Sequence, residues 1–455
     1  MTRPIANTQR LLSAAALMIT GAVLPAFPSF AQNPEQRFHN IVSDVSASRI
    51  ATDISVLAGF GTRHTLSGTD SDTRGIGASR RWIKTEFERI SENCGGCLEV
   101  LEIAETVSGS RIPEPTEVVN IVAIQRGTTD PDRFAIMSGD IDSRISDVMN
   151  FEDDSPGAND NASGMAGVLE AARVLSAYRF GGSIVYAGLS GEEQGLFGGA
   201  ILARYAGEHN WNIDAVLNND MIGNITGSNG VTDNTTARVF SEGTRYVETG
   251  EEAIQRRFQG GEVDSSSRNL ARYIDTMADH FLPNLDVMMV YRLDRFGRGG
   301  HHRPFNEAGY PAVRIMETNE NYRWQHQDIR VEDGIEYGDV LEHVDFDYAA
   351  KLTALNAVTL ASLAWAPAPP ANVEIRGQVS ADTTLSWGRI PDAAHYKLHW
   401  RLTTEPQWSY SRTIGDVAEF TLHDIIIDNY FFGVSSVSED GVESPVVFPG
   451  PAGAF

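Results

Sequence analysis

The sequence is poor in positive charge: its 455 residues contain 36 Lys and Arg against 61 Asp and Glu, a formal net charge of −25. A chain with so few basic residues cannot neutralise many phosphates, which argues against nucleic acid and anionic lipid as partners. Beyond the first 31 residues it also lacks any apolar run near the roughly 18 residues that cross a bilayer, so no membrane span is predicted. Hydrophobic residues still make up 42% of the chain, which excludes wholesale disorder.

Cysteine is also scarce, since Cys94 and Cys97, in Asn-Cys-Gly-Gly-Cys, are the only two. One pair is too few for a four-cysteine zinc site or a disulfide-based scaffold. In a cytosolic protein this spacing would indicate redox catalysis or half a zinc site, whereas in an exported chain it favours a small local disulfide. Because such a bond closes only a short loop, we expect it to add little stability.

The one long apolar run lies at the N-terminus. Arg3 and Arg10 give the chain a positive start, residues 11–24 are apolar, and Ser-Phe-Ala at 29–31 has the spacing of a cleavage site. This pattern is typical of a signal peptide, which we assign to residues 1–31. We therefore expect an exported protein, either periplasmic or secreted.

The central part of the chain alternates short apolar runs with helical segments. Residues 40–89 contain apolar residues at the spacing of a helix. Further on, strands are predicted at residues 118–124, 134–137, 183–189, 215–217 and 312–316, and helices at 163–176 and 195–205. This alternation indicates an α/β fold with a mixed, mainly parallel sheet sandwiched by helices.

The composition changes at residues 366–370, Ala-Pro-Ala-Pro-Pro, which predicts a stiff linker. The strand signals after it are short and closely spaced, and they lie at residues 384–387, 396–401, 420–422 and 430–434. No helical periodicity separates them, so we predict an all-β sandwich. The segment resembles a fibronectin type III domain in length and in the placement of Trp387 and Tyr396. The predicted organisation is a signal peptide at 1–31, an α/β domain at 32–366 and the β-sandwich at 367–455.

Acidic residues follow the predicted strands. They are Asp140 and Asp142 after 134–137, Asp160 in the Gly-rich loop GANDNASG, Glu192 and Glu193 after 183–189, and Asp220 after 215–217. Each alone is more often a helix cap or turn former. Strand ends in an open α/β sheet converge on one crevice, however, and gathered carboxylates repel one another unless a cation neutralises them. We therefore predict a metal site, with His326 as its imidazole ligand.

The order of these motifs is distinctive. Asp-x-Asp, GANDNASG, SGEEQGL, Asn-Asp-Met and then a His near an Asp resembles the secreted co-catalytic zinc aminopeptidases, which include bacterial leucyl aminopeptidases. The resemblance covers residues 40–365. It implies a zinc exopeptidase fold for the α/β domain, which would be the metallo-exopeptidase catalytic domain, with two neighbouring zinc ions.

The resemblance also implies a role for each acidic motif. The metal ligands that the resemblance implies are Asp140, Asp160, Glu193, Asp220 and His326. Asp160 would bridge both ions, and Glu192 would be the general base that activates a metal-bound water and passes its proton to the leaving amine. The implied reaction is hydrolysis of the N-terminal peptide bond of peptides with a free N-terminus.

The sequence departs from the family pattern at position 140, where the family has His and this chain has Asp140. The second metal site would then consist of Asp140, Asp160 and Asp220 alone, and an all-carboxylate set suits a harder divalent ion better than zinc. We therefore expect firmly bound zinc at Asp160, Glu193 and His326, and a weakly held second ion.

A second departure is His301-His302, where the family has Asp-His. His301 either offers the imidazole that position 140 lacks or is a plain substitution in a substrate loop. His302 is expected to shape the pocket or to be satisfied within the fold. Asp142 lies on the same strand face as Asp140. In the family this Asp orients the ligand histidine, and here a turn or capping role is an equal alternative.

The leading hypothesis is an exported zinc metallo-aminopeptidase acting on peptides. One alternative is an acyltransferase of the single-zinc glutaminyl cyclase type, which a weakened second metal site would suit. The other is a catalytically impaired binding protein, which the five intact motif positions argue against. The sequence indicates no oligomeric state, and it leaves residues 225–290 open as a lid, an insertion or a dimer surface.

Overall fold

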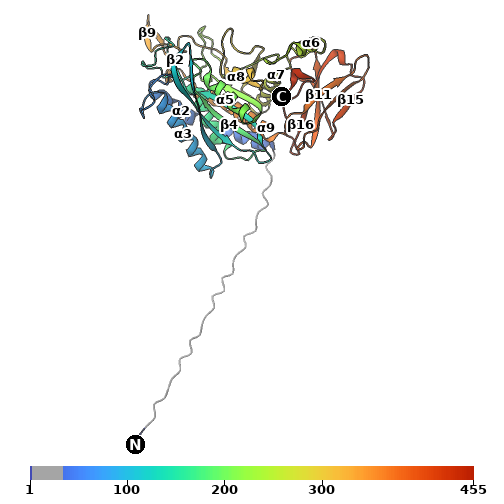
Figure 1. Ribbon diagram of the computed structural model, residues 1–455, viewed down its shortest axis with the longest axis horizontal. Helices are drawn as coiled ribbons and strands as arrows, with labels where there is room; N and C mark the ends of the chain where they lie inside the picture. The colour runs from blue at the N-terminus through green and yellow to red at the C-terminus, as the bar shows by residue number, and fades with distance from the viewer. Residues whose placement is uncertain (3–33) are drawn as a thin grey trace. The chain divides into compact units, whose positions relative to one another are not determined.

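An eight-stranded sheet forms the centre of the computed structural model, which describes residues 1–2 and 34–455 (Figure 1). Its strands are β1 (Glu99–Gly109), β2 (Ile112–Gln125), β3 (Asp130–Asp140), β4 (Gly182–Leu189), β5 (Asn212–Asn219), β6 (Thr236–Ser241), β7 (Asp286–Val290) and β8 (Ala312–Glu317). Their order is β1-β2-β4-β3-β5-β8-β6-β7. The pairs β3–β4, β3–β5, β5–β8 and β6–β7 are parallel, and the others are antiparallel. The predicted signal peptide lies almost wholly outside the described residues.

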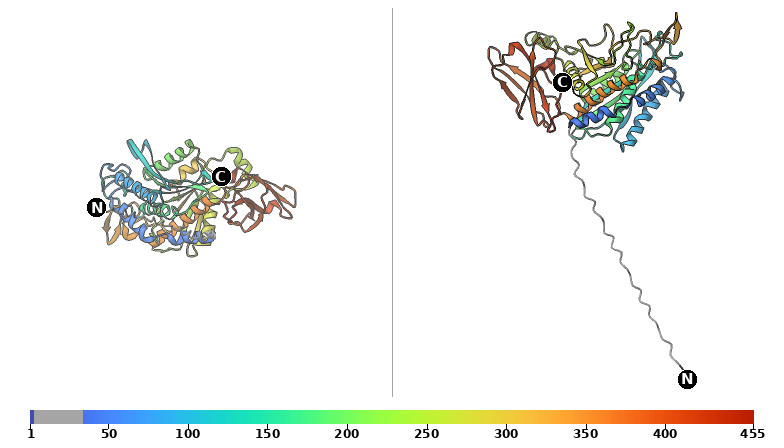
Figure 2. Two further views of the ribbon diagram at one scale, coloured as in Figure 1. Left: turned by 90° about the horizontal axis from the view of Figure 1, so that it is seen from below. Right: turned by 180° about the vertical axis from the view of Figure 1, so that it is seen from behind.

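Helices cover both faces of this sheet (Figure 2). They are α1 (Pro34–Asp44), α2 (Ala47–Gly59), α3 (Ile76–Asn93), α4 (Ala162–Leu175), α5 (Phe197–Glu208), α7 (Ser266–Phe281), α8 (His302–Glu307) and α9 (Phe346–Trp365). A further helix, α6 (Gly250–Gln259), has no buried residue and lies outside these layers. One face packs against α1 to α4, α7 and α9, and the other packs against α5 and α8. This arrangement confirms the predicted α/β fold. None of the described helices has the length and apolarity needed to cross a bilayer.

The sequence does not predict α9, although it is the central helix of one face. Its side chains are buried on nearly every side from Leu352 to Ala364. A helix buried all round has no polar face, so the 3.6-residue alternation that identifies surface helices is missing. At its start, Asp345 caps the helix by accepting a hydrogen bond from the Tyr348 amide at 2.8 Å.

The C-terminal strands form two antiparallel sheets, β11-β12-β15 and β14-β13-β16 (orange to red in Figure 1). Their bounds are β11 (Ala371–Arg376), β12 (Thr383–Gly388), β13 (His395–Leu402), β14 (Tyr410–Ile414), β15 (Glu419–Leu422) and β16 (Tyr430–Val437). Side chains from both sheets, such as Trp387 and Tyr396, share one buried cluster. The all-β prediction is confirmed, and the likeness to a fibronectin type III domain stays a prediction.

Residues 225–290 complete the sheet and contact the C-terminal strands. They supply β6 and β7 at the sheet edge, and α7 packs against both. The Asp264 carboxylate accepts from Arg272 at 3.0 Å and from Arg401 of β13 at 2.6 Å. Residues 34–455 accordingly form one compact unit.

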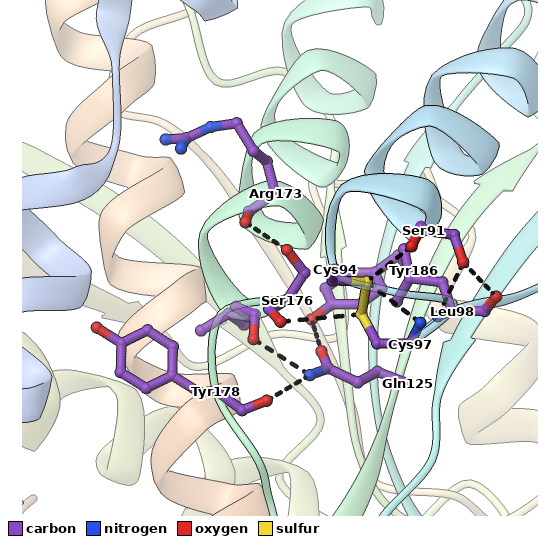
Figure 3. Close-up of a disulfide and its surroundings, with 10 residues drawn as sticks. Ser91, Cys94, Cys97, Leu98, Gln125, Arg173, Ser176, Tyr178 and Tyr186 are labelled. Carbon is purple, nitrogen blue, oxygen red and sulfur yellow. Dashed lines mark hydrogen bonds between the residues drawn. A yellow bond between two sulfur atoms is a disulfide. The ribbon is translucent and has the colours of Figure 1, made fainter. Parts of the chain in front are cut away.

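A disulfide joins Cys94 to Cys97 at the turn from α3 into β1 (Figure 3). Gly95 and Gly96 between them have φ of 77° and 85°, a left-handed conformation that glycine adopts without steric cost. Ser91 closes the same turn, because its Oγ donates to the Leu98 carbonyl at 2.8 Å. The bond therefore fixes a local turn, as the spacing predicts.

Candidate metal centre

The carboxyl ends of three neighbouring parallel strands place the acidic motifs at one edge of the sheet. β3 ends at Asp140, β4 ends three residues before Glu192, and β5 ends immediately before Asp220. A cleft of about 430 Å³ opens at this edge, and its walls include Asp160, Glu192, Glu193, Asp220 and His326. The crevice expected from the strand order is therefore present.

Three side chains in this cleft meet at one point. His326 Nε2 lies 2.8 Å from Asp160 Oδ2 and 2.9 Å from Glu193 Oε1. These three possible metal-ligand atoms all lie within 4.8 Å of one another, and both carboxylates are buried. We call Asp160, Glu193 and His326 the three-donor group. Two carboxylates and one imidazole make an ordinary zinc ligand set. The residues therefore fit one zinc ion.

The charges of these groups are strongly coupled. Burial disfavours a charged imidazole, but the carboxylates of Glu193 and Asp160 outweigh it and raise the pKa of His326 to about 9. Burial likewise opposes ionisation of Asp160, yet the His326 imidazolium and hydrogen bonds from His326 and Gln325 hold its pKa well below the usual range. The two carboxylates thus stabilise a positive charge at this point, and a bound cation would take the place of the His326 proton.

Arg144 contacts the outer atoms of two members of this group. Its Nε donates to Glu193 Oε2 at 2.8 Å, and its Nη2 lies 2.6 Å from His326 Nδ1. The inner atoms, Glu193 Oε1 and His326 Nε2, are left facing Asp160. Arg144 therefore sets the orientation of Glu193, one of the three candidate ligands, and no local pattern in the sequence indicates this contact.

Replacing Arg144 with Met is expected to weaken zinc binding about 10–100-fold, because partners that orient ligands contribute this much to metal affinity. Competition with a chromophoric chelator measures the affinity. Arg303→Met is the matched control, because Arg303 lines the same cleft but bonds Glu307 at 2.6 Å and none of the three candidate ligands. The zinc affinity of the Arg303→Met protein should therefore stay within about twofold of the native value. Equal affinities for Arg144→Met and native protein would contradict the positioning role.

Asp339 fixes the loop that carries Asp160. Its two carboxylate oxygens accept from the backbone amides of Asn159 at 2.8 Å and of Asp160 at 2.7 Å. Burial raises the pKa of Asp339 to about 7 in spite of these hydrogen bonds. The sequence gives no local sign of this contact, because Asp339 lies 179 residues beyond Asp160.

Asp142 holds the backbone of the two adjacent glutamates. Its Oδ1 accepts from the Glu192 amide at 3.2 Å, and its Oδ2 accepts from the Glu193 amide at 3.1 Å and from Thr65 Oγ1 at 3.0 Å. The structure therefore gives Asp142 a purpose that does not depend on a histidine at position 140. It aims Glu193 at the metal position and Glu192 into the cleft.

Glu192 lines the cleft beside the three-donor group without belonging to it. Burial raises its pKa well above the usual range, and the nearby carboxylates of Asp220 and Glu193 raise it further. A carboxyl group whose pKa is raised holds a proton more readily and can also release it, which general acid–base catalysis requires.

Asp140 and Asp220 have other partners. Asp140 Oδ1 lies 2.6 Å from His301 Nδ1, and its Oδ2 accepts from Asn161 Nδ2 at 2.6 Å. Asp220 Oδ2 lies 2.8 Å from Arg314 Nη2. Among the described residues, neither carboxylate belongs to the three-donor group. The two departures from the family pattern, at positions 140 and 301, are thus in direct contact.

His302 is held within the fold. Its side chain is fully buried, with Nε2 2.9 Å from the Leu293 carbonyl and 3.5 Å from Asp294 Oδ2. Burial lowers its pKa to about 4. His302 is not among the described residues that line the cleft, and its Nδ1 is buried without a hydrogen-bond partner in the described part of the chain, so the structure shows neither of its two expected roles in full.

The sequence interpretation also misses Arg314, which is fully buried in the middle of β8. A visible signal exists, because an arginine interrupts the otherwise apolar run at residues 312–316. Arginine is almost never fully buried unless it is paired, so its position there indicates an internal ion pair.

Comparison with known proteins agrees with this geometry. The model of peptidase family M28 matches residues 120–345. A probable zinc metalloprotease of Leptosphaeria maculans is 43% identical over 92% of this chain and 98% of its own length, and one of Pyricularia oryzae is 43% identical over 92% and 86%. The LapA aminopeptidase of Legionella pneumophila shares the fold, with a TM-score of 0.52 and 19% identity over 73% of this chain and 75% of that one. The chain belongs to peptidase family M28.

Proposed function

We propose that this protein is an exported zinc aminopeptidase that removes single residues from the N-terminus of peptides. The observation that carries the proposal is the meeting of Asp160 Oδ2, Glu193 Oε1 and His326 Nε2 beside Glu192 in one cleft. Relatives named as probable zinc metalloproteases support the choice of metal and of a hydrolase. The leader-like pattern at residues 1–31 supports export, and sequencing the mature N-terminus would test it.

The residues divide the chemistry between them. Zinc held by Asp160, Glu193 and His326 supplies a Lewis acid when bound. Glu192 accepts the proton of the attacking water and returns it to the leaving amine, which its raised pKa permits. Asp142 keeps the two glutamates in their separate directions by holding both backbone amides.

The size of the cleft supports exopeptidase action. A space of about 430 Å³ is of the order that holds a small ligand, such as the terminal residue of a peptide. A bond in the middle of a folded chain would need a longer open groove. We therefore expect cleavage one residue from a chain end.

A second candidate follows from the basic side chains in the cleft wall, which are Arg111, Arg144, Arg295, Arg298 and Arg303. Arginine forks match carboxylates. Four of these five side chains already bond a glutamate of the fold, so it is their remaining N–H groups that suit a substrate carboxylate. That group is either an acidic side chain of an aminopeptidase substrate or the C-terminal carboxylate of a carboxypeptidase substrate. Carboxypeptidase action is therefore the second candidate function.

Two substrate sets separate these candidates. Aminoacyl anilides with neutral and acidic side chains should be hydrolysed, whereas N-acetylated dipeptides with a free C-terminus should not. The opposite result would establish carboxypeptidase action. Pyroglutamate formed from a Gln-peptide would instead indicate the cyclase alternative, and no turnover of any substrate by the zinc-loaded protein would favour the binding protein.

Removing the metal is expected to abolish hydrolysis, because the three ligands by themselves provide no Lewis acid. Dialysis against a chelator should remove the activity, and one equivalent of zinc should restore it. Magnesium is the control, since a site with an imidazole ligand prefers zinc to hard ions. Full activity in the chelator-treated, zinc-free protein would contradict the proposal.

A further inference from the structure

Two carboxylates at the centre lie outside the three-donor group and are nevertheless deeply buried. Asp140 and Asp220 are 2% and 3% exposed, and they stand at the ends of the adjacent strands β3 and β5. Buried carboxylates beside Asp160 require positive charge or hydrogen-bond donors. The residues around them show which of these the chain supplies.

The positive charge beside Asp220 is the guanidinium of Arg314. Its Nη2 forms an ion pair with Asp220 Oδ2 at 2.8 Å, and its Nε donates to the Asp220 carbonyl at 2.8 Å. The register of the sheet causes this contact, because Arg314 in β8 pairs with Asn218 in β5, two residues before Asp220. The side chain is fully buried.

Arg314 is also fixed from its other side. Its Nη1 donates to Asp294 Oδ2 at 3.1 Å and to the Gly299 carbonyl at 2.8 Å. Asp294 is itself buried, so moving the guanidinium away would leave a buried carboxylate without this partner. The cation beside Asp220 is therefore a permanent part of the fold.

Asp140 has donors on both oxygens, one from Asn161 and one from His301. Asp220 lines the same cleft as Asp160, but its Oδ2 is already paired with Arg314, and Asp140 is not among the described residues of the cleft wall. The second ligand set therefore does not fit a metal ion. One nitrogen of His301 could still bind a metal ion, because its Nε2 is buried without a hydrogen-bond partner in the described part of the chain. A second ion would have to use this atom and displace Arg314.

From this geometry we propose that Arg314 takes the place of a second metal ion, so that the centre holds one zinc. The inference rests on the proposed zinc site at Asp160, Glu193 and His326. A guanidinium in contact with Asp220 supplies a fixed positive charge and repels a divalent ion from the same carboxylate. Unlike a metal, it cannot be removed by a chelator or exchanged for another ion.

Metal stoichiometry tests the proposal without reference to activity. The full chain is freed of metal, saturated with excess Zn²⁺, desalted and analysed for zinc and protein. One zinc per chain is expected, and a Co²⁺ titration followed by absorbance should end at one equivalent. Two zinc ions per chain would overturn this inference alone, whereas none would overturn the zinc site and the proposed function with it.

Substitutions at Arg314 test the cause. Arg314→Met removes the charge at similar volume, so the count of bound zinc should rise from one toward two. Arg314→Lys is the matched control, because it keeps the charge and should stay at one. A folded Arg314→Met protein that still binds one zinc would overturn the role given to Arg314. If Arg314→Met does not fold, the count in the native protein and in Arg314→Lys still decides the proposal, since two ions in either contradict it.

Discussion

Replacing Glu192 with Gln is expected to lower kcat by about 10²–10⁴-fold, the usual contribution of a general acid–base group. Glutamine keeps the shape of the side chain but cannot accept the proton of the attacking water. Zinc content should not change, because Glu192 lies outside the three-donor group. The measurements are kcat on an aminoacyl anilide and zinc per chain on the same preparation.

Glu193→Gln is the matched control for this experiment. The two glutamates are neighbours whose backbone amides are both held by Asp142, and neither substitution removes those two hydrogen bonds. Glu193→Gln should lose zinc affinity as well as rate, because Glu193 Oε1 is one of the three donors. Loss of zinc from Glu192→Gln, or unchanged kcat, would remove Glu192 from the proposed mechanism.

The fold was predictable wherever the pattern is local. The runs at 134–137, 183–189 and 215–217 lie within β3, β4 and β5, and the acids after the last two runs, Glu192, Glu193 and Asp220, line the cleft. Each of these strands is apolar and ends at a polar loop, so the period and the end of the strand are both visible in the sequence. The helix predicted at 163–176 corresponds to α4 for the same reason.

The partners of the site were not predictable, because the contacts join distant parts of the chain. Arg314 meets Asp220 from 94 residues away, and Arg144 meets His326 from 182 residues away. Sequence spacing places an acid at a strand end, but which side chain reaches it depends on strand order. β8 lies next to β5 in the sheet although β6, α6, α7, β7 and α8 separate them along the chain.

The role of Asp142 illustrates the same limit at short range. Its position two residues after Asp140 predicts a shared strand face. In the structure, however, it bonds the amides of Glu192 and Glu193, while Asp140 bonds His301. A buried carboxylate accepts hydrogen bonds from the nearest unpaired donors. Here these donors are the backbone amides that follow β4, and they come close to Asp142 only because β4 pairs with β3.

Replacing Asp264 with Ala is expected to lower the free energy of unfolding by about 3–5 kcal/mol, the cost of breaking a buried ion pair from one side. Asp264 is fully buried and accepts from Arg272 at 3.0 Å and from Arg401 at 2.6 Å. Its loss leaves two buried guanidinium groups without this carboxylate, where α7 meets the C-terminal strands. Urea denaturation followed by circular dichroism measures the change.

An exposed ion pair of the same C-terminal strands provides the control for this prediction. Arg376 and Glu419 lie 2.6 Å apart with more than half of each side chain exposed. Glu419→Ala should therefore cost only about 0–1 kcal/mol, because water and salt already screen the pair. If Asp264→Ala costs no more than Glu419→Ala, the C-terminal sheets do not depend on Asp264 for their attachment. A large cost for Asp264→Ala with unchanged zinc content would instead show that this contact stabilises the fold independently of the metal centre.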